Sequence, residues 1–275
     1  MRVAVILSTY NWPRALELVL HGYAVQSHRD FEVVIADDGS REETRALIDG
    51  MARDSGLRLR HVWHPDRGFR KSEILNRAII AADADYLVFS DGDTIPERDF
   101  VATHARFAER GHFLAGGYVK LNRKVSERIT VDDVRSGRAT SLTWLVAHGF
   151  LPPAKPLRWA PEPVGALLDR FTTTPARWHG NNASTFRDYL IEVNGFDMEM
   201  GYGGQDAALG DRLENLGVSP KRIRHRSIAV HLWHERPWRD PAGKLRNDAI
   251  RMRIQQNREI RATLGIAELE SAGER

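Results

Sequence analysis

The segment at residues 86–100 reads YLVFSDGDTIPERDF, and it decides the fold class expected for the chain. It opens with a short, strongly apolar run, which is typical of a strand buried on both faces of a parallel sheet. Two acids separated by a glycine, Asp91-Gly92-Asp93, follow where that strand should end. Asp-Gly is a common turn pair, so the motif alone indicates exposed acids at a turn. Its position after a buried strand gives the carboxylates a second interpretation, as ligand-binding groups.

Strands and helices alternate through the first 120 residues. The expected strands are mainly apolar runs at residues 2–7, 31–36, 57–64, 85–90 and 112–121. The expected helices lie between them, at residues 13–25, 44–56, 70–84 and 97–111. This βαβα order predicts an α/β fold with a doubly wound, mostly parallel central sheet flanked by helices.

Two further polar clusters follow strands directly, STYN at residues 8–11 and DDGS at residues 37–40. Ligands of doubly wound sheets bind outside the carboxyl ends of the strands. Because those ends meet at one edge of a parallel sheet, we expect all three polar clusters to gather there. The DDGS cluster is equally compatible with a turn that caps the next helix. Its functional interpretation is a carboxylate that accepts a hydrogen bond from a nucleobase or ribose.

The rest of the chain divides into two parts. Residues 120–178 contain the proline cluster LPPAKPLRWAPEP and show poor periodicity, which predicts an irregular insertion long enough to be functional. Regular structure is expected again after residue 178. It includes a helix at residues 205–217, a strand at 227–234 and a helix from Lys244 to about Leu264.

The composition is that of a globular protein with an ample core: 275 residues, 42% hydrophobic and 28% charged. A formal net charge of +3 gives no indication of nucleic-acid binding, and we expect none. Basic residues gather in PKRIRHRS and KLRNDAIRMRIQQNREIR, which suits a solvated face or, less commonly, an anionic ligand or lipid headgroups. The chain has no cysteine and no long apolar run, so the expected location is cytoplasmic.

The two acids of the opening segment suit a hard divalent cation. Mg²⁺ and Mn²⁺ take oxygen ligands, and Mg²⁺ usually shares its coordination with substrate phosphates. One of Asp91 and Asp93 can bind the cation, while the other holds a sugar hydroxyl or a metal-bound water. Gly92 between them lets a ligand approach the backbone closely.

Two later motifs offer further chemistry. The glycine-rich segment at residues 195–213 places Asp206 at a helix start, where it is either a general base or an ordinary partner of the helix dipole. The motif HLWH contains His231 and His234. On a strand this spacing puts the two rings on opposite faces, so a joint His-His site is not expected. One of them, together with Asp93, would complete a metal site.

Four segments together carry a family resemblance: VAVILSTYNWPRALELVL, FEVVIADDGSREET, SDGD and GFDMEMGYGGQDAALGDRL. In this order they resemble family 2 of the nucleotide-sugar glycosyltransferases, which have the GT-A fold. The C-terminal part is similar to the galactosyltransferase-type segment of that group and of chondroitin-type polymerases. The resemblance covers about residues 1–120 and 178–235. It implies one compact domain with a nucleotide-sugar-binding half (1–119), an acceptor-related insertion (120–178) and an acceptor and catalytic half with a C-terminal helix (179–275).

The resemblance implies inverting transfer of a hexose or N-acetylhexosamine from a UDP-sugar, with Mn²⁺ or Mg²⁺, to a hydroxyl of a glycan or lipid-linked acceptor. Asp206 would be the general base, and Asp93 would bind the metal with His231, or with His234 in its place. The residues implied at the nucleotide sugar are Ser8, Thr9 and Tyr10 for the nucleoside, Asp38 for the base edge, Arg70 near the nucleotide, and Asp91 for the ribose or donor sugar.

The acceptor contacts expected from the sequence are Gln205, Tyr202 and Trp178. The family commonly has Glu-Asp where this chain has Gln205-Asp206, so Gln205 indicates a different or neutral acceptor contact. A neutral neighbour should also leave Asp206 less basic. Trp178 lies beside the insertion and suits stacking on a sugar, although Trp is equally common in cores.

Three other functions remain compatible with these motifs. A nucleotidyltransferase that makes an activated sugar usually has a glycine-rich, basic loop after the first strand, where this chain reads STYN. A non-catalytic nucleotide-sugar-binding protein and a retaining transferase would share the fold. The basic C-terminal helix is also compatible with peripheral contact with an anionic membrane.

Overall fold

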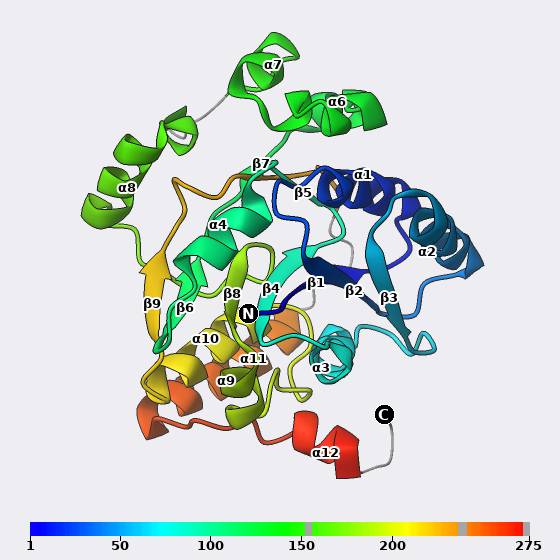
Figure 1. Ribbon diagram of the computed structural model, residues 1–275. Helices are drawn as coiled ribbons and strands as arrows, with labels where there is room; N and C mark the ends of the chain where they lie inside the picture. The colour runs from blue at the N-terminus through cyan, green and yellow to red at the C-terminus, as the bar shows by residue number, and fades with distance from the viewer. Residues whose placement is uncertain (152–155, 236–240, 272–275) are drawn as a thin grey trace.

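A computed structural model of the chain describes residues 1–151, 156–235 and 241–271 and shows a mixed α/β fold (Figure 1). Its main feature is a seven-stranded, mostly parallel sheet flanked by helices, which confirms the predicted fold class. In spatial order the strands are β3 (Arg58–Trp63), β2 (Phe31–Asp37), β1 (Val3–Thr9), β4 (Tyr86–Asp91), β8 (Ala183–Phe186), β6 (His112–Ala115) and β9 (Ser219–Arg222).

The register of the parallel strands brings the polar clusters together. Strands β3, β2, β1 and β4 run parallel, with Thr9 opposite Asp37 and Ser8 opposite Asp91. The strand ends therefore align at one edge of the sheet, as predicted. Burial on both faces explains why these strands read as continuous apolar runs in the sequence.

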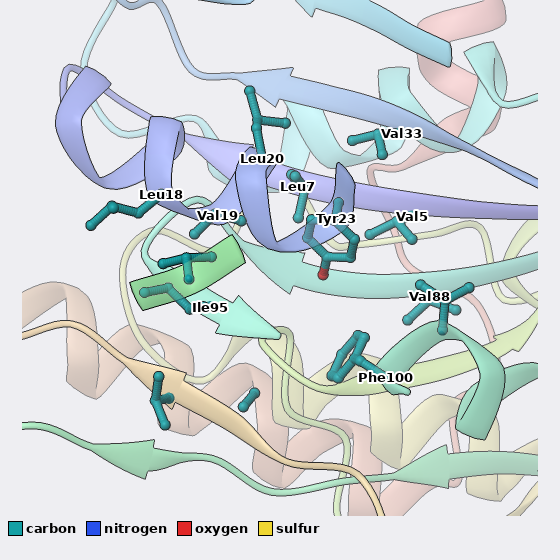
Figure 2. Close-up of a cluster of buried hydrophobic side chains, with 14 of the residues drawn as sticks. Val5, Leu7, Leu18, Val19, Leu20, Tyr23, Val33, Val88, Ile95 and Phe100 are labelled. Carbon is teal, nitrogen blue, oxygen red and sulfur yellow. The ribbon is translucent and has the colours of Figure 1, made fainter. Parts of the chain in front are cut away.

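Alternate residues of the central strands pack into cores on opposite faces of the sheet. Val5 of β1 belongs to the core under α1 (Pro13–Ala24), and its neighbour Ile6 belongs to the core under α3 (Lys71–Ala81). Figure 2 shows the first of these cores, in which Tyr23 of α1 lies close to the strand residues. The other helices of this half are α2 (Glu42–Asp54) and α4 (Phe100–Phe107).

The strand expected at residues 112–121 is divided into β6 and a separate β7 (Val119–Lys120). Gly116 and Gly117 separate the two, and the chain passes very close to Asn182 at this point. A Cβ on Gly116 would lie 2.0 Å from Asn182 Oδ1, so no other residue fits there. The Gly116 N–H donates to the Asn182 carbonyl (2.9 Å), after which the chain leaves the large sheet.

Two strands of the large sheet were not predicted from the sequence. Strands β8 and β9 have four residues each and read ASTF and SPKR. Such short, partly polar segments lack the apolar run or the alternation that indicates a strand. Strand β8 is antiparallel to both of its neighbours, β4 and β6, and so joins the two halves of the sheet.

A small second sheet contains β5 (Thr94–Pro96), β10 (Ala229–His231) and β7. Strand β10 is antiparallel to β5, with His231 opposite Thr94. This pairing places His231 beside Asp93, more than 130 residues earlier in the chain. The strand expected to reach residue 234 ends at His231.

Residues 120–178 form short helices rather than the irregular insertion expected. They are α5 (Arg123–Arg128), α6 (Val131–Arg135), η1 (Arg138–Thr140), α7 (Leu142–Ala147), η2 (Pro156–Trp159) and α8 (Glu162–Phe171). The longest has ten residues, too few for a clear helical periodicity. Residues 152–155 of the proline cluster lie outside the described part of the chain.

The C-terminal half contains α9 (Arg187–Glu192), α10 (Gln205–Asn215), α11 (Pro241–Asn257) and α12 (Ile266–Ser271). The long helix expected up to about residue 264 ends at Asn257, and Arg258 has a left-handed φ of 52°. None of the helices in the described ranges combines the length and the apolar character that crossing a bilayer requires.

Glu97 connects β5 to the segment that leads into β10. Its carboxylate accepts the Ile228 N–H (2.6 Å), and its own N–H donates to the Ile228 carbonyl (3.1 Å). Burial raises the pKa of Glu97 from 4.5 to about 7, against the opposing effect of the Ile228 N–H. Folding therefore favours the protonated form of this side chain.

We expect Glu97→Gln to stabilise the protein at pH 8 but not at pH 4. The unfolded chain loses the Glu97 proton near pH 4.5 and the folded chain near pH 7, so the wild type loses stability as the pH rises through this window. The gain at pH 8 is about 1–3 kcal/mol, the upper figure applying to complete burial. Urea unfolding at both pH values measures it, and a stability difference that does not change with pH would contradict the assignment.

Candidate functional site

A cavity of about 790 Å³ opens where the parallel strands end. Its walls come from the loops after β1, β2 and β4, from the start of α10 and from the end of β10. It brings together most of the residues proposed from the sequence. These are Ser8, Thr9, Tyr10, Asp38, Asp91, Asp93, Tyr202, Gln205, Asp206, His231 and His234.

The loop after β1 is held in place by hydrogen bonds to its neighbours. Asn11 has a left-handed φ of 45°, and its N–H donates to Ser40 Oγ (2.8 Å). Ser8 Oγ donates to Asp91 Oδ1 (2.6 Å), which fixes one carboxylate of the Asp-Gly-Asp motif. The Tyr10 hydroxyl donates to Asp66 (2.9 Å), and its half-exposed ring stands at the mouth of the cavity, where it is available to a ligand.

The adjacent acids Asp37 and Asp38 have different environments. Asp37 is 1% exposed and bonds His61 (2.9 Å) and the Ser40 N–H (2.8 Å), so it organises the turn. Asp38 lines the cavity, and its carboxylate contacts His64 Nε2 (2.8 Å). Asp38 is therefore the acid of the pair that a ligand can reach.

Arg70 does not direct its side chain into the cavity. Its guanidinium pairs with Glu73, while its backbone N–H donates to Asp38 Oδ2 (3.1 Å). Lys71 lines the cavity instead, with its ammonium 2.7 Å from Asp91 Oδ1. Arg70, which the sequence placed near the nucleotide, thus contacts Asp38 through its backbone N–H. The positive charge in the cavity comes from Lys71.

The charges of Lys71 and Asp91 stabilise each other. Burial opposes the ammonium of Lys71, but Asp91 and Asp206 outweigh this effect and raise the pKa of Lys71. Burial likewise opposes the carboxylate of Asp91, and the charge of Lys71 with its hydrogen bond outweighs it and lowers the pKa of Asp91. Both groups are ionised at neutral pH, so Asp91 already has a cationic partner.

Asp93, His231 and His234 form a group of three donors whose ligand atoms lie within 4.8 Å of one another. Asp93 Oδ2 is 3.6 Å from His231 Nε2 and 3.4 Å from His234 Nε2. The expectation that the two rings lie on opposite faces is wrong. Because β10 ends at His231, the chain turns and the two rings stack, with centroids 5.2 Å apart.

The hydrogen bonds of the two histidines favour metal ligation. Each Nδ1 lies 2.6 Å from a backbone carbonyl, that of Leu232 for His231 and that of Glu235 for His234. A carbonyl only accepts, so each Nδ1 carries a proton, which leaves the Nε2 of each ring, on the side of Asp93, as the atom that can bind a metal ion. Burial, together with the like charge of Asp91, raises the pKa of Asp93 despite these rings. The donor set fits a divalent cation, whose charge would offset this unfavourable environment.

Asp206 lies in the first turn of α10 after Gly203 and Gly204, which have left-handed φ values of 97° and 91°. Its Oδ1 has no hydrogen-bond partner among the described residues. The chain comes close here, since a Cβ on Gly180 would lie 2.7 Å from this oxygen. Burial raises the pKa of Asp206, and the positive charge of Lys71 partly offsets this rise. Burial thus makes Asp206 more basic, whereas the neutral neighbour Gln205 was expected to make it less basic. A carboxylate with a raised pKa in a cavity is suited to accepting a proton.

A residue of α11 that sequence reasoning missed holds the loop before Asp206. Asn247 is 1% exposed, and its Nδ2 lies near the carbonyls of Gly201 (3.1 Å), Tyr202 (3.2 Å) and Gly203 (2.7 Å). Gln205 supports the same loop, accepting the Gly203 N–H (2.9 Å). A lone Asn within a basic helix carries no signal of this role in the sequence.

The expected acceptor contact by Trp178 is wrong. Its ring is 1% exposed and packs between Phe89 (5.3 Å) and Phe113 (5.7 Å) in the core beneath the cavity. The following residue, His179, lines the cavity together with Tyr118, and their rings are 6.5 Å apart. Neither was selected from the sequence, because a single His or Tyr in an aperiodic segment gives no specific signal.

The sequence is similar to glycosyltransferases of known and unknown substrate. It matches the profile described as Glycosyl transferase family 2 over residues 4–149. It is 29% identical to validoxylamine A glucosyltransferase of Streptomyces hygroscopicus subsp. jinggangensis over 85% of this chain and 56% of that protein. It is 24% identical to chondroitin synthase of Escherichia coli over 78% of this chain and 32% of that protein. The chain thus spans about half the length, or less, of these relatives.

The fold is similar to that of solved glycosyltransferase structures. Mannosyltransferase PcManGT from Pyrobaculum calidifontis, in complex with GDP-Man and Mn²⁺, superposes with a TM-score of 0.58 at 19% identity, covering 98% of this chain and 67% of that one. S. aureus TarS in complex with UDP-GlcNAc gives 0.61 at 16% identity, covering 98% and 69%. These likenesses show the GT-A type of fold.

The family match ends at residue 149, so the galactosyltransferase-type resemblance of the C-terminal part stays a prediction. The match covers more than half of the chain and includes Asp38, Asp91 and Asp93. The chain therefore belongs to glycosyl transferase family 2.

Proposed function

We propose that this enzyme transfers a hexose or N-acetylhexosamine from a UDP-sugar to a hydroxyl of a glycan or lipid-linked acceptor, with inversion and with a divalent metal ion. One observation carries the proposal: a single cavity contains a carboxylate with a raised pKa, Asp206, and a group of three metal-ligand residues around Asp93. Lys71 lies within electrostatic reach of both acids. The general base and the cations for the leaving group are thus present together.

The donor end of the cavity suits a nucleotide with an N–H on its base. The Asp38 carboxylate accepts hydrogen bonds only, and uracil and guanine both present an N–H donor there. The TarS structure holds UDP-GlcNAc and the PcManGT structure GDP-Man, which supports a nucleoside diphosphate sugar. We favour the UDP-sugar of the family resemblance.

Asp93, His231 and His234 would hold the metal ion, which offsets the charge of the donor diphosphate when bound. Two imidazoles and one carboxylate favour Mn²⁺ over Mg²⁺, because Mg²⁺ prefers oxygen ligands. The PcManGT structure contains Mn²⁺.

The residues of the chain divide the reaction between them. Lys71 places a buried positive charge where the diphosphate leaving group develops its negative charge. The Asp206 carboxylate accepts the proton of the acceptor hydroxyl as that oxygen attacks the anomeric carbon. Attack opposite the leaving group in one displacement inverts the anomeric centre, and the configuration of the product checks this assignment.

The basic C-terminal helix gives no support to the membrane contact expected from the sequence. Lys244 and Arg251 pair with Asp248 and Asp211, and Arg253 pairs with Glu259 (3.1 Å). These acids already balance part of the charge of the helix. Membrane contact is therefore no part of the function proposed here.

A thermal-shift panel tests donor class and metal together. UDP, GDP, dTDP and CMP are each added with Mn²⁺, Mg²⁺ or EDTA, and a ligand that binds only the folded state raises Tm. We expect the largest shift with UDP and Mn²⁺ and a much smaller one with UDP and EDTA. A larger shift with GDP would change the assigned donor, and no shift with any nucleotide would contradict the proposal.

Asp206→Asn should abolish transfer and leave nucleotide binding intact. Loss of the proton acceptor is expected to slow the release of UDP from UDP-sugars, with water or a glycan panel as acceptor, by about 10²–10⁴-fold. Calorimetry should give unchanged affinity for UDP with Mn²⁺. Asp188→Asn is the matched control, since Asp188 also lies in a first helical turn but is exposed outside the cavity. Equal loss of binding and transfer would indicate a structural role.

His234→Ala should weaken metal-dependent nucleotide binding. Removal of one of three ligands is expected to raise the Mn²⁺ concentration required for half-maximal UDP binding by at least about tenfold. His28→Ala, the same change at a residue outside the cavity, should behave like the wild type. Wild-type dependence on Mn²⁺ in the His234 variant would remove this residue from the ligand set.

A further inference from the structure

Helix α8 exposes its apolar face. Val164, Leu167 and Phe171 are 46%, 56% and 69% exposed. Their spacing of three and four residues places them on one side of the helix, and we refer to these three residues as the apolar stripe. Figure 1 shows α8 at the outer edge of the molecule. Within the described part of the chain, no member of the stripe belongs to a hydrophobic core.

The opposite face of α8 fixes this orientation. Asp169 is buried, and its carboxylate bonds His225 Nδ1 (2.9 Å) and Arg226 Nε (2.9 Å). Gly165, one turn earlier, lies so close to the same segment that a Cβ on it would be 2.6 Å from the His225 carbonyl oxygen. An amphipathic surface helix usually turns its apolar side toward the core. Here the buried polar contacts hold the helix the other way round, so the stripe cannot turn inward without breaking them.

Positive charge gathers beside the apolar stripe. The segment PKRIRHRS at residues 220–227, which contacts the polar face of α8, contains four Lys or Arg residues and no acid. Its Arg222 Nε donates to the carbonyl of Thr174, just beyond the end of the helix (3.1 Å). Arg170, in the last turn of α8, lies against the Phe171 ring (5.7 Å) at the edge of the stripe. An exposed apolar face thus has cations at its borders.

The acids of α8 leave this charge largely uncancelled. Asp169 is buried in its contacts with the basic segment, where it balances one arginine. Glu162, at the start of the helix, pairs with a further cation, Arg106 (3.3 Å). Exposed apolar patches often mark interaction sites, and cationic borders select a partner with negative charge.

We propose that the apolar stripe of α8 docks onto an anionic membrane surface. Helices that lie in a membrane interface combine Phe, Leu and similar side chains with neighbouring Lys or Arg. The stripe would enter the boundary between headgroups and acyl chains, and the cations beside it would contact the lipid phosphates. This surface is distinct from the C-terminal helix, whose cations pair with acids. The inference goes beyond the proposed function and does not depend on it.

A second copy of the chain fits the apolar stripe less well. In a dimer with two-fold symmetry, the stripe of one copy would meet the same stripe of the other. The basic segments that flank the two stripes would then come close together, and like charges repel. An anionic surface attracts the same segments, so the charge around the stripe favours the membrane.

Co-sedimentation of the full chain with lipid vesicles tests the proposal. We expect binding to vesicles of equal parts phosphatidylglycerol and phosphatidylcholine. Binding to vesicles of phosphatidylcholine alone should be at least about tenfold weaker, because several cations lie beside the stripe. Added salt should weaken the binding to the mixed vesicles. The measurement contains no nucleotide, so its outcome is independent of the proposed function.

The double variant Leu167→Ser, Phe171→Ser tests the apolar stripe itself. It should bind the mixed vesicles at least about tenfold more weakly, because two large apolar side chains no longer enter the membrane. Both side chains are largely exposed, so Tm should not change. Leu245→Ser is the matched control, since Leu245 is 73% exposed on a different helix, α11. None of these residues lines the cavity, so UDP binding should be equal in all variants.

Arg170→Gln tests the charge beside the stripe. Loss of one cation near an anionic surface should weaken binding to the mixed vesicles by about fivefold. Arg45→Gln is the control, because Arg45 is an exposed residue of α2, which lies on the other side of the molecule from α8 (Figure 1).

Three outcomes would overturn the proposal. The first is wild-type protein that does not sediment with the mixed vesicles or binds both kinds of vesicle equally. The second is a double variant that binds the mixed vesicles as tightly as wild type. The third comes from sedimentation velocity without lipid: a dimer that forms in wild type and not in the double variant would show that a second copy covers the stripe.

Discussion

The ion pair between Lys71 and Asp91 is the interaction on which the rest of the site depends. Asp91, Asp93 and Asp206 share one cavity, and three carboxylates in a poorly hydrated space repel one another. The ammonium of Lys71 stands within reach of all three and hydrogen-bonds only Asp91. Asp91 is thereby held as an anion, while the pKa values of Asp93 and Asp206 stay raised. The position of Lys71 at the start of α3 thus gives Asp91 a lowered pKa, whereas those of Asp93 and Asp206 are raised.

Sequence reasoning succeeded where a local pattern determines the structure. Apolar runs followed by polar turns located the parallel strands. Because the strands are parallel and in register, their ends align, and this placed the polar turns together. It failed where distant segments meet. The direction of His234 depends on where β10 ends, the burial of Trp178 on aromatic rings from two other strands, and the choice between Arg70 and Lys71 on a pairing with Glu73. The spacing of apolar residues along the sequence gives no information on contacts between distant segments.

The two ends of the cavity are formed by different kinds of secondary structure. The end proposed to bind the donor lies where strand ends are aligned by the sheet register: Asp91 ends β4, Asp38 follows β2, and Lys71 begins α3. The other end consists of loops and short helices, held by side-chain contacts such as those of Asn182 and Asn247. Loops tolerate sequence change better than paired strands do. This difference suits a family that keeps a common donor chemistry and changes the acceptor.

The hydrogen bonds from Asn247 also set an order of events during synthesis of the protein. Asn247 of α11 fixes the loop before Asp206, and this helix begins more than thirty residues after the loop. The helix therefore leaves the ribosome well after the loop does. Strands β1, β2, β3 and β4, by contrast, are complete once residue 91 has emerged. A nascent chain can therefore form the edge of these four strands before the loop beside Asp206, the proposed general base, is held in place. If the proposed roles hold, a chain whose C-terminal helix has not yet docked would bind the nucleotide sugar without transferring it.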